Sequence, residues 1–240
     1  MKDLRQRCEW DAAQTHESLR PYLIEEAYEV DDAIRAGNDG LLREELGDLL
    51  LQVLFHSVVA EERGAFDFAD VAEGFLTKMK ARHPHLYEGG ERQSWEGMKA
   101  KKRNSIVDGL PADLPALHRA FRLQDRAAGV GFDWADARGP ADKVEEELAE
   151  VRAEVARGAK ASGNGVPDAR LEEELGDLLF SVVNLSRKLG VHPSLALDKA
   201  NVKFAARFQA IERLAKERGI DVKTAGLEVL DRLWDDVKAS

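Results

Sequence analysis

The sequence contains a single cysteine, Cys8, among its 240 residues. One cysteine cannot form an intrachain disulfide, and it excludes a zinc site built on several cysteine ligands. The chain also lacks an apolar run near the ~18 residues that a membrane helix needs, because its longest candidate, residues 49–60, contains Gln52, His56 and Ser57. The first seven residues include four charged ones and show no apolar signal core. We therefore expect a soluble, cytoplasmic protein.

The sequence also contains fewer basic than acidic residues. Lysine and arginine number 35 against 45 aspartates and glutamates, which gives a net charge of −10. Such a surface repels nucleic-acid backbones and anionic membranes, so we expect no nucleic-acid or membrane partner. Alternating β-branched residues are also scarce, whereas alanine, leucine, glutamate, arginine and lysine dominate. This composition predicts an all-α fold.

Four sequence blocks occur twice, in the same order. Residues 44–50 and 173–179 are identical, and the other matching pairs are residues 25–30 with 146–151, 78–82 with 203–207, and 95–99 with 234–238. Four ordered matches predict a duplicated domain. We expect a first domain over residues 1–107, a proline-containing linker over 108–116 and a second domain over 117–240. The second copy has extra small residues at 161–167, which predict a surface loop.

Two segments, residues 49–60 and 178–185, are apolar on nearly every helical face. A helix that is apolar all round belongs in the centre of a bundle or in an oligomer interface. A domain of this size has few other helices with which to surround one. The sequence therefore predicts helical-bundle domains that form a homodimer.

Acidic residues recur at helical spacing in both copies. Residues three and four apart share a helix face, so Glu26 and Glu29, with Glu25 beside them, point the same way, as do Glu45 and Asp48. The second copy repeats the pattern with Glu146, Glu147, Glu150, Glu174 and Asp177. A solvated face with ordinary ion pairs is the alternative, but two repeated acidic motifs favour a cation site. Oxygen ligands without sulfur or imidazole favour Mg²⁺ or Mn²⁺, and the absence of Glu-x-x-His argues against a di-iron centre.

A basic stripe follows in the second copy. Lys199, Lys203 and Arg207 occur at intervals of four residues, and no acid lies four residues from any of them along the stripe. The stripe either pairs with acids across helices or binds an anion, and next to metal-binding acids it suggests a metal-bound polyphosphate. Trp95 and Trp234 are either core aromatics or stacking surfaces for a nucleobase.

The order Glu-Glu-x-x-Glu, a gap and Glu-x-x-Asp resembles the MazG family of nucleoside triphosphate pyrophosphohydrolases. The resemblance extends from residues 8–11 through 83–85 and Gly-Phe-Asp-Trp at 131–134 to Trp234, and departs at Glu9, where the family usually has proline. It implies an all-α dimer with a nucleotide-pool house-cleaning role. Its reaction would be hydrolysis of the α–β bond of NTPs and dNTPs to nucleoside monophosphate and pyrophosphate.

The resemblance also implies site residues. Mg²⁺ would be held by Glu147, Glu150, Glu174 and Asp177, and in the first copy by Glu26, Glu29, Glu45 and Asp48. ATP and other nucleotides would contact Lys143, Arg170, Lys203, Arg207 and Trp234. The metal would orient and acidify an attacking water, and Glu146 or Glu25, beside the ligands, is our candidate for the general base.

The two copies differ in positive charge near these acids. Tyr22 stands where the second copy has Lys143, and Leu41 stands where it has Arg170. We therefore expect the second copy to carry most of the activity. Two alternatives remain open from the sequence: another metal-dependent phosphohydrolase, and a non-enzymatic dimeric regulator that binds nucleotides.

Overall fold

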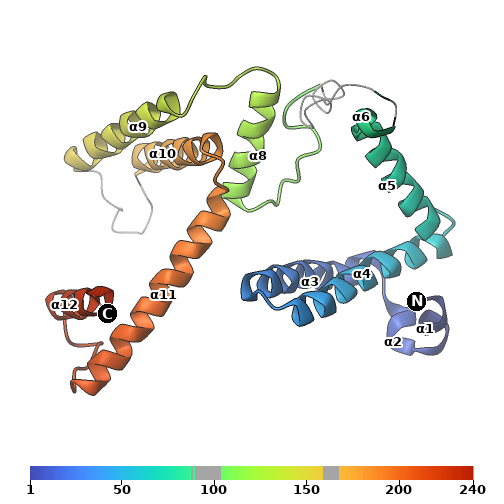
Figure 1. Cartoon of the computed structure of the whole chain (residues 1–240), viewed down its shortest axis with the longest axis horizontal. Helices are drawn as coiled ribbons and strands as arrows, with labels where there is room; N and C mark the ends of the chain where they lie inside the picture. The colour runs from blue at the N-terminus through green and yellow to red at the C-terminus, as the bar shows by residue number, and fades with distance from the viewer. Residues whose placement is uncertain (88, 90–103, 159–167, 240) are drawn as a thin grey trace. The chain divides into compact units, whose positions relative to one another are not determined.

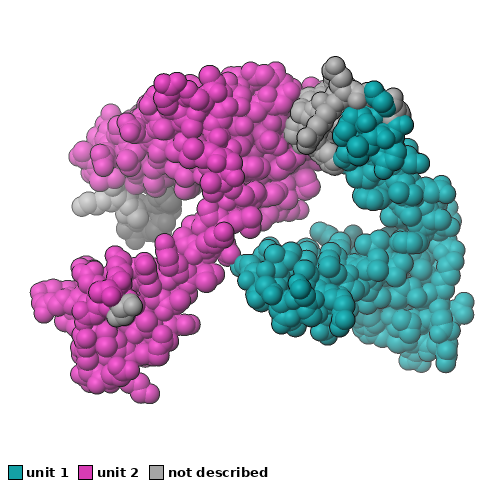
Figure 2. Space-filling view, in the orientation of Figure 1, with its two compact units in different colours: residues 1–93 teal, residues 94–240 magenta. Residues whose placement is uncertain are grey.

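The computed structural model describes residues 1–87, 89, 104–158 and 168–239. Within these residues every regular element is a helix, which confirms the all-α prediction (Figure 1). The chain divides into two compact units, unit 1 over Met1–Gln93 and unit 2 over Ser94–Ser240 (Figure 2). The repeated block at 95–99, with Trp95, and the loop at 161–167 lie outside the described residues. The 108–116 linker stays a prediction.

Unit 1 is built around a pair of antiparallel helices, α3 and α4. Its described helices are α1 (Lys2–Arg7), α2 (Glu9–Ala13), α3 (His16–Ala36), α4 (Asp39–Glu62), α5 (Phe68–Arg82) and α6 (Pro84–Tyr87). Thr15 and Ser18 form a capping box that starts α3, and Gly37 ends it in the left-handed region at φ 62°. The side chain of Asn38 then accepts hydrogen bonds from the first turn of α4. A two-residue connection therefore folds α4 back along α3.

Unit 2 contains the equivalent pair, α9 and α10, together with three further helices. Its described helices are α8 (Ala116–Gly129), α9 (Arg138–Ala156), α10 (Ala169–Lys188), α11 (Pro193–Glu217) and α12 (Leu227–Ala239). Helix α9 packs along α10, and α8 packs against the other side of α10. Helix α11 leads away from this group, and α12 folds back onto its far end (Figure 1). A small core of Ile211, Ala215 and Leu233 holds that corner together.

The N-cap residue of α9, Ala137, makes no side-chain cap. Tertiary contacts hold the start of this helix. Asp133 accepts ion pairs from Arg187 at 2.5 Å and from Lys188 at 2.8 Å, both near the end of α10. Trp134 packs so closely on Gly139 that a Cβ there would lie 2.2 Å from the indole ring. The Gly-Phe-Asp-Trp segment thus sets where α9 begins relative to α10.

Many large apolar side chains of α4 and α10 are exposed in the single chain. Leu50 is 51% exposed and Leu179 is 58% exposed, and both lie in the segments for which the sequence predicts a place in a bundle centre or in an oligomer interface. Among the described helices, none has the length and apolar character that crossing a membrane requires.

Candidate metal and nucleotide site

The second pair of helices brings three of the predicted ligands together. Glu147 and Glu150 extend from α9 and Glu174 extends from α10, and carboxylate oxygens of all three lie within 4.8 Å of one another. Glu147 is only 4% exposed because α9 packs along α10 at this level. The helical spacing of three residues and the antiparallel packing together create the cluster.

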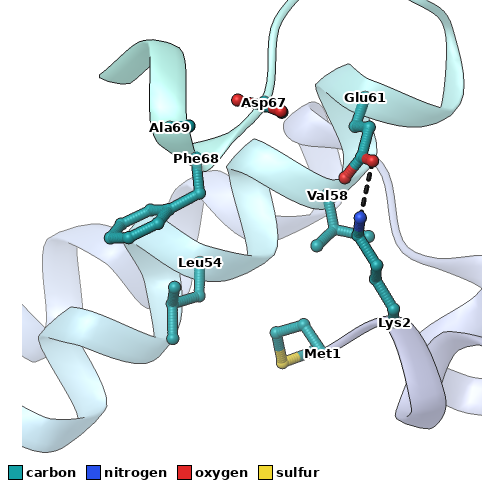
Figure 3. Close-up of a pocket in the computed structure, with 8 residues that line it drawn as sticks. All are labelled: Met1, Lys2, Leu54, Val58, Glu61, Asp67, Phe68 and Ala69. Carbon is teal, nitrogen blue, oxygen red and sulfur yellow. Dashed lines mark hydrogen bonds and ion pairs between the residues drawn. The ribbon is translucent and has the colours of Figure 1, made fainter. Parts of the chain in front are cut away.

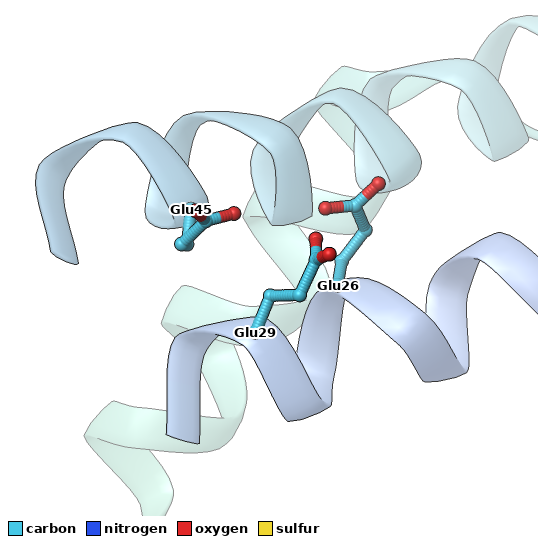
Figure 4. A group of neighbouring side chains, drawn as sticks. All are labelled: Glu26, Glu29 and Glu45. Atoms are coloured by element: carbon cyan, nitrogen blue, oxygen red, sulfur yellow. The ribbon is translucent and has the colours of Figure 1, made fainter. Parts of the chain in front are cut away.

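Unit 1 forms the same arrangement from its own helices. Glu26 and Glu29 come from α3 and Glu45 from α4, again with carboxylate oxygens within 4.8 Å (Figure 4). Glu26 and Glu45 are half-buried, whereas Glu29 is exposed. The equivalence of the two clusters agrees with the duplication that the sequence predicts.

Mutual repulsion and burial shift the acids toward their neutral forms. Burial raises the pKa of Glu26, and the charges of Asp48, Glu29, Glu45 and Glu25 raise it further. Burial, followed by the charges of Glu29, Asp48 and Glu44, raises the pKa of Glu45. A bound cation would relieve this repulsion.

In the second cluster the pKa of Glu150 is raised in the same way. Burial, then a hydrogen bond and the charge of Glu147, then the charge of Glu174, raise the pKa of Glu150. The cluster offers only hard oxygen donors from two helices, so its residues fit Mg²⁺ or Mn²⁺.

The fourth predicted ligand of each set lies outside the close group of three. Asp48 is near enough for its charge to raise the pKa values of both Glu26 and Glu45. Asp177 is exposed on α10, three residues after Glu174. Both stand on the correct helix, and their roles as ligands stay predictions.

Lys143 occupies the side of the second cluster. Its Nζ lies 2.6 Å from a carboxylate oxygen of Glu147 and 2.9 Å from one of Glu146. Glu146, the predicted base, has a side chain that is 58% exposed. In unit 1 the equivalent residue, Tyr22, instead packs edge-on against Trp10, with ring centroids 6.1 Å apart.

Arg170 lies at the mouth of the second cluster, in the first turn of α10. A cavity of about 340 Å³ opens there, and its lining includes Glu150 and Glu174 together with Arg157 and Arg170. Arg157 was not predicted from the sequence. It forms an ion pair with Glu154 at the end of α9. Its position, seven residues after Glu150 and therefore on the same helix face, was a usable signal.

The remaining predicted nucleotide contacts gather on α11 and α12. The guanidinium of Arg207 lies 5.7 Å from the ring centre of Trp234, and the ring of Phe204 lies 5.5 Å from the same indole. Trp234 also packs against the Ile211 core, so it serves partly as a core aromatic. Lys203 is exposed. Figure 1 shows this corner of unit 2 apart from the α9–α10 pair that carries the acids.

Two other cavities lie away from the acidic clusters. In unit 1, a cavity of about 250 Å³ is lined by Met1, Leu54 and Phe68 and bordered by the Lys2–Glu61 ion pair (Figure 3). In unit 2, a mostly apolar cavity of about 700 Å³ lies beside the Gly-Phe-Asp-Trp segment, between α8 and α10. Neither contains a group of acids suited to a metal ion.

Comparison with known proteins agrees with this arrangement. Residues 14–87, which include the first cluster, match the MazG nucleotide pyrophosphohydrolase domain. The nucleoside triphosphate pyrophosphohydrolase/pyrophosphatase MazG of Thermotoga maritima is 46% identical over 238 residues, covering 96% of this chain and 89% of that protein. The nucleoside triphosphate pyrophosphohydrolase of Escherichia coli K12 is 41% identical over 250 residues, covering 99% of this chain and 93% of its own length.

Both relatives align along nearly the whole chain, so the similarity includes unit 2 as well as the residues that match the domain family. Identity above 40% over this length is far beyond what a shared helical composition produces. With its paired acidic clusters and this similarity, the chain belongs to the MazG family of nucleoside triphosphate pyrophosphohydrolases.

Proposed function

We propose that this protein is a Mg²⁺-dependent nucleoside triphosphate pyrophosphohydrolase that cleaves NTPs and dNTPs between the α and β phosphates. The observation that carries the proposal is the group of three carboxylates on α9 and α10, within 4.8 Å of one another, in a chain of this family. Mn²⁺ would serve in place of Mg²⁺. Nucleoside monophosphate and pyrophosphate would be the products, and removal of unwanted nucleotides from the cellular pool would be the role.

The protein's own residues suggest how the reaction proceeds. Glu147, Glu150 and Glu174, joined by Asp177, would hold the metal, which supplies charge neutralisation at the phosphates and a more acidic water. Glu146, exposed beside the cluster, would accept the proton of the attacking water. Arg170 and Arg157, at the mouth of the cavity, would bind phosphate oxygens.

The corner of α11 and α12 would complete the nucleotide site in a homodimer. Lys203 and Arg207 supply cations and Trp234 an aromatic surface. In one chain the end of α11 and α12 lie apart from the α9–α10 pair (Figure 1). The exposed apolar residues of α10, including Leu175, Leu179 and Phe180, suit burial against a second copy. The same pairing would bring the partner's corner near the acidic helices.

The experiment is to incubate the protein with dCTP or ATP and Mg²⁺ and to separate the first products by anion-exchange chromatography. Monophosphate and pyrophosphate are expected in equal amounts, and no turnover after EDTA treatment. Diphosphate and orthophosphate as first products would replace the proposal with another phosphohydrolase activity. Binding of nucleotide without turnover at any divalent cation would indicate a regulator.

A further inference from the structure

In unit 2 the side chain of Lys143 contacts two carboxylates that differ in their exposure to solvent. Its Nζ contacts Glu147, whose side chain is 6% exposed, at 2.6 Å, and Glu146, whose side chain is 58% exposed, at 2.9 Å. The lysine side chain itself is 39% exposed. It therefore joins a buried member of the acidic cluster to a residue at the protein surface.

The contact with Glu147 competes directly with a metal ion. Glu147 also lies within 4.8 Å of Glu150 and Glu174, so the same carboxylate serves both the ammonium group and the cluster. Mg²⁺ binds carboxylate oxygens at about 2.0–2.1 Å and demands near-octahedral geometry. An ammonium hydrogen-bonded to Glu147 reduces the charge available to the metal and repels it. The two cations would therefore share the charge of Glu147 and repel each other across it.

We propose that Lys143 is an exchangeable counter-ion, which neutralises Glu147 in the metal-free protein and is released toward a substrate phosphate when the metal binds. The inference rests on the proposed function, since it needs the metal site on α9 and α10. It makes Lys143 a residue that couples metal binding to polyphosphate binding.

The position of the side chain allows this exchange. A lysine carries its charge on a flexible four-carbon stem, and this one already reaches the surface beside Glu146. After it leaves Glu147, the ammonium stays close to the cluster and meets the phosphates that the metal attracts. Metal and triphosphate then favour each other's binding, and such coupling is typically about 5- to 150-fold. Unit 1 has Tyr22 at this position and therefore has no lysine there that could exchange in this way.

The first test measures metal affinity directly, without turnover. The full chain carrying Glu26→Gln and Glu45→Gln, which disables the first cluster, is titrated with Mn²⁺, and free Mn²⁺ is followed by electron paramagnetic resonance. Adding Lys143→Met should tighten Mn²⁺ binding about tenfold, because the competing cation is gone. Lys143→Arg should keep the weaker affinity, because the charge remains.

Lys188→Met is the matched control. It removes Lys188, the last residue of α10, from its 2.8 Å pair with Asp133, outside the acidic cluster. It should lower thermal stability and leave Mn²⁺ affinity unchanged. Equal or weaker Mn²⁺ binding by the Lys143→Met protein would overturn the exchange and leave the proposed metal site standing. Absence of any Mn²⁺ binding to the parent protein would overturn both.

The second test measures the coupling. Binding of α,β-methylene-ATP to the same proteins is measured by calorimetry at matched free Mn²⁺ concentrations. In the parent protein Mn²⁺ should strengthen analogue binding, and in the Lys143→Met protein this enhancement should fall about tenfold. An undiminished enhancement would show that Lys143 takes no part in binding the phosphates, and would overturn the second half of the proposal.

Discussion

Units 1 and 2 present the same acids in the same geometry but surround them with different charges. In unit 1 the neighbours that shift Glu26 are all acidic. In unit 2 the equivalent Glu147 is more deeply buried and is neutralised by Lys143, and Arg170 and Arg157 line the adjoining cavity. The comparison teaches that duplication preserved the acidic cluster, whereas, among the described residues, the cations found beside it belong to unit 2.

The largest expected effect comes from disabling one cluster at a time. Glu147→Gln with Glu150→Gln should lower kcat for dCTP with Mg²⁺ by about two to three orders of magnitude, because metal and phosphate binding both fail. Glu26→Gln with Glu29→Gln should leave more than half of the rate. Product formation measured at saturating nucleotide checks both. Equal losses would show that the two units work equally.

The next effect comes from transferring the missing charges to unit 1. In a chain whose second cluster is disabled, Tyr22→Lys with Leu41→Arg places cations at the positions of Lys143 and Arg170. Residual activity should rise about tenfold, equivalent to ~1.4 kcal/mol of transition-state stabilisation. The matched control is Tyr22→Met with Leu41→Gln, which alters the same positions without charge. A similar rise in the control would mean that charge is not what unit 1 lacks.

The segments that precede α9 in unit 2 and α3 in unit 1 should stabilise the protein with a different dependence on pH. The ion pairs to Arg187 and Lys188 lower the pKa of Asp133, against the opposing effect of burial, from 3.8 to about 2. A lowered folded-state pKa stabilises above the unfolded value, and this stability is lost as pH falls through about 2. Asp133→Asn should therefore cost about 1 kcal/mol at pH 7, after allowance for solvent screening.

Urea unfolding of the Asp133→Asn protein at pH 7, 5 and 3 provides the measurement. The difference from the unmodified protein should hold between pH 7 and 5 and begin to shrink at pH 3. Thr15→Ala, which removes the cap of α3, should cost a similar ~1 kcal/mol without this acid dependence. A pH-independent loss for Asp133→Asn would assign its effect to packing.

The smallest expected effect is a change of Tm that has opposite signs for the two clusters in the metal-free protein. A raised folded-state pKa means that ionised Glu26 destabilises unit 1 above that pKa, and that the penalty disappears as pH falls below the unfolded value. Glu26→Gln in EDTA should therefore raise Tm by about 1–2 °C at pH 8 and by progressively less toward pH 4.5. Glu147→Gln should lower Tm instead, because it leaves Lys143 without its buried partner. Calorimetry of both proteins with matched buffers distinguishes the two signs.

Much of the fold and part of the site could be predicted from the sequence. Helical composition and spacing predicted the all-α architecture and placed Glu26 with Glu29 and Glu147 with Glu150, because these depend on neighbours a few residues away. The repeated acidic motifs predicted that Glu45 lies near the first pair and Glu174 near the second, and the structure brings each within 4.8 Å of its pair. That these groups bind a metal stays a prediction. Arg157 was not predicted, because only the packing of α9 on α10 brings it into one cavity lining with Arg170.

The sequence by itself determined the repeat, the helices and which faces carry the acids, since helix periodicity is a local property. Only the tertiary structure decided how deeply each acid is buried, whereas the i,i+4 spacing of Lys143 and Glu147 already places that lysine beside its acid. Packing of α9 along α10 buries Glu147, so its ion pair with Lys143 joins a buried carboxylate to a half-exposed lysine. Likewise, the path of α11 carries α12 away from the α9–α10 pair in one chain (Figure 1). These outcomes depend on contacts between distant segments, which local spacing does not specify.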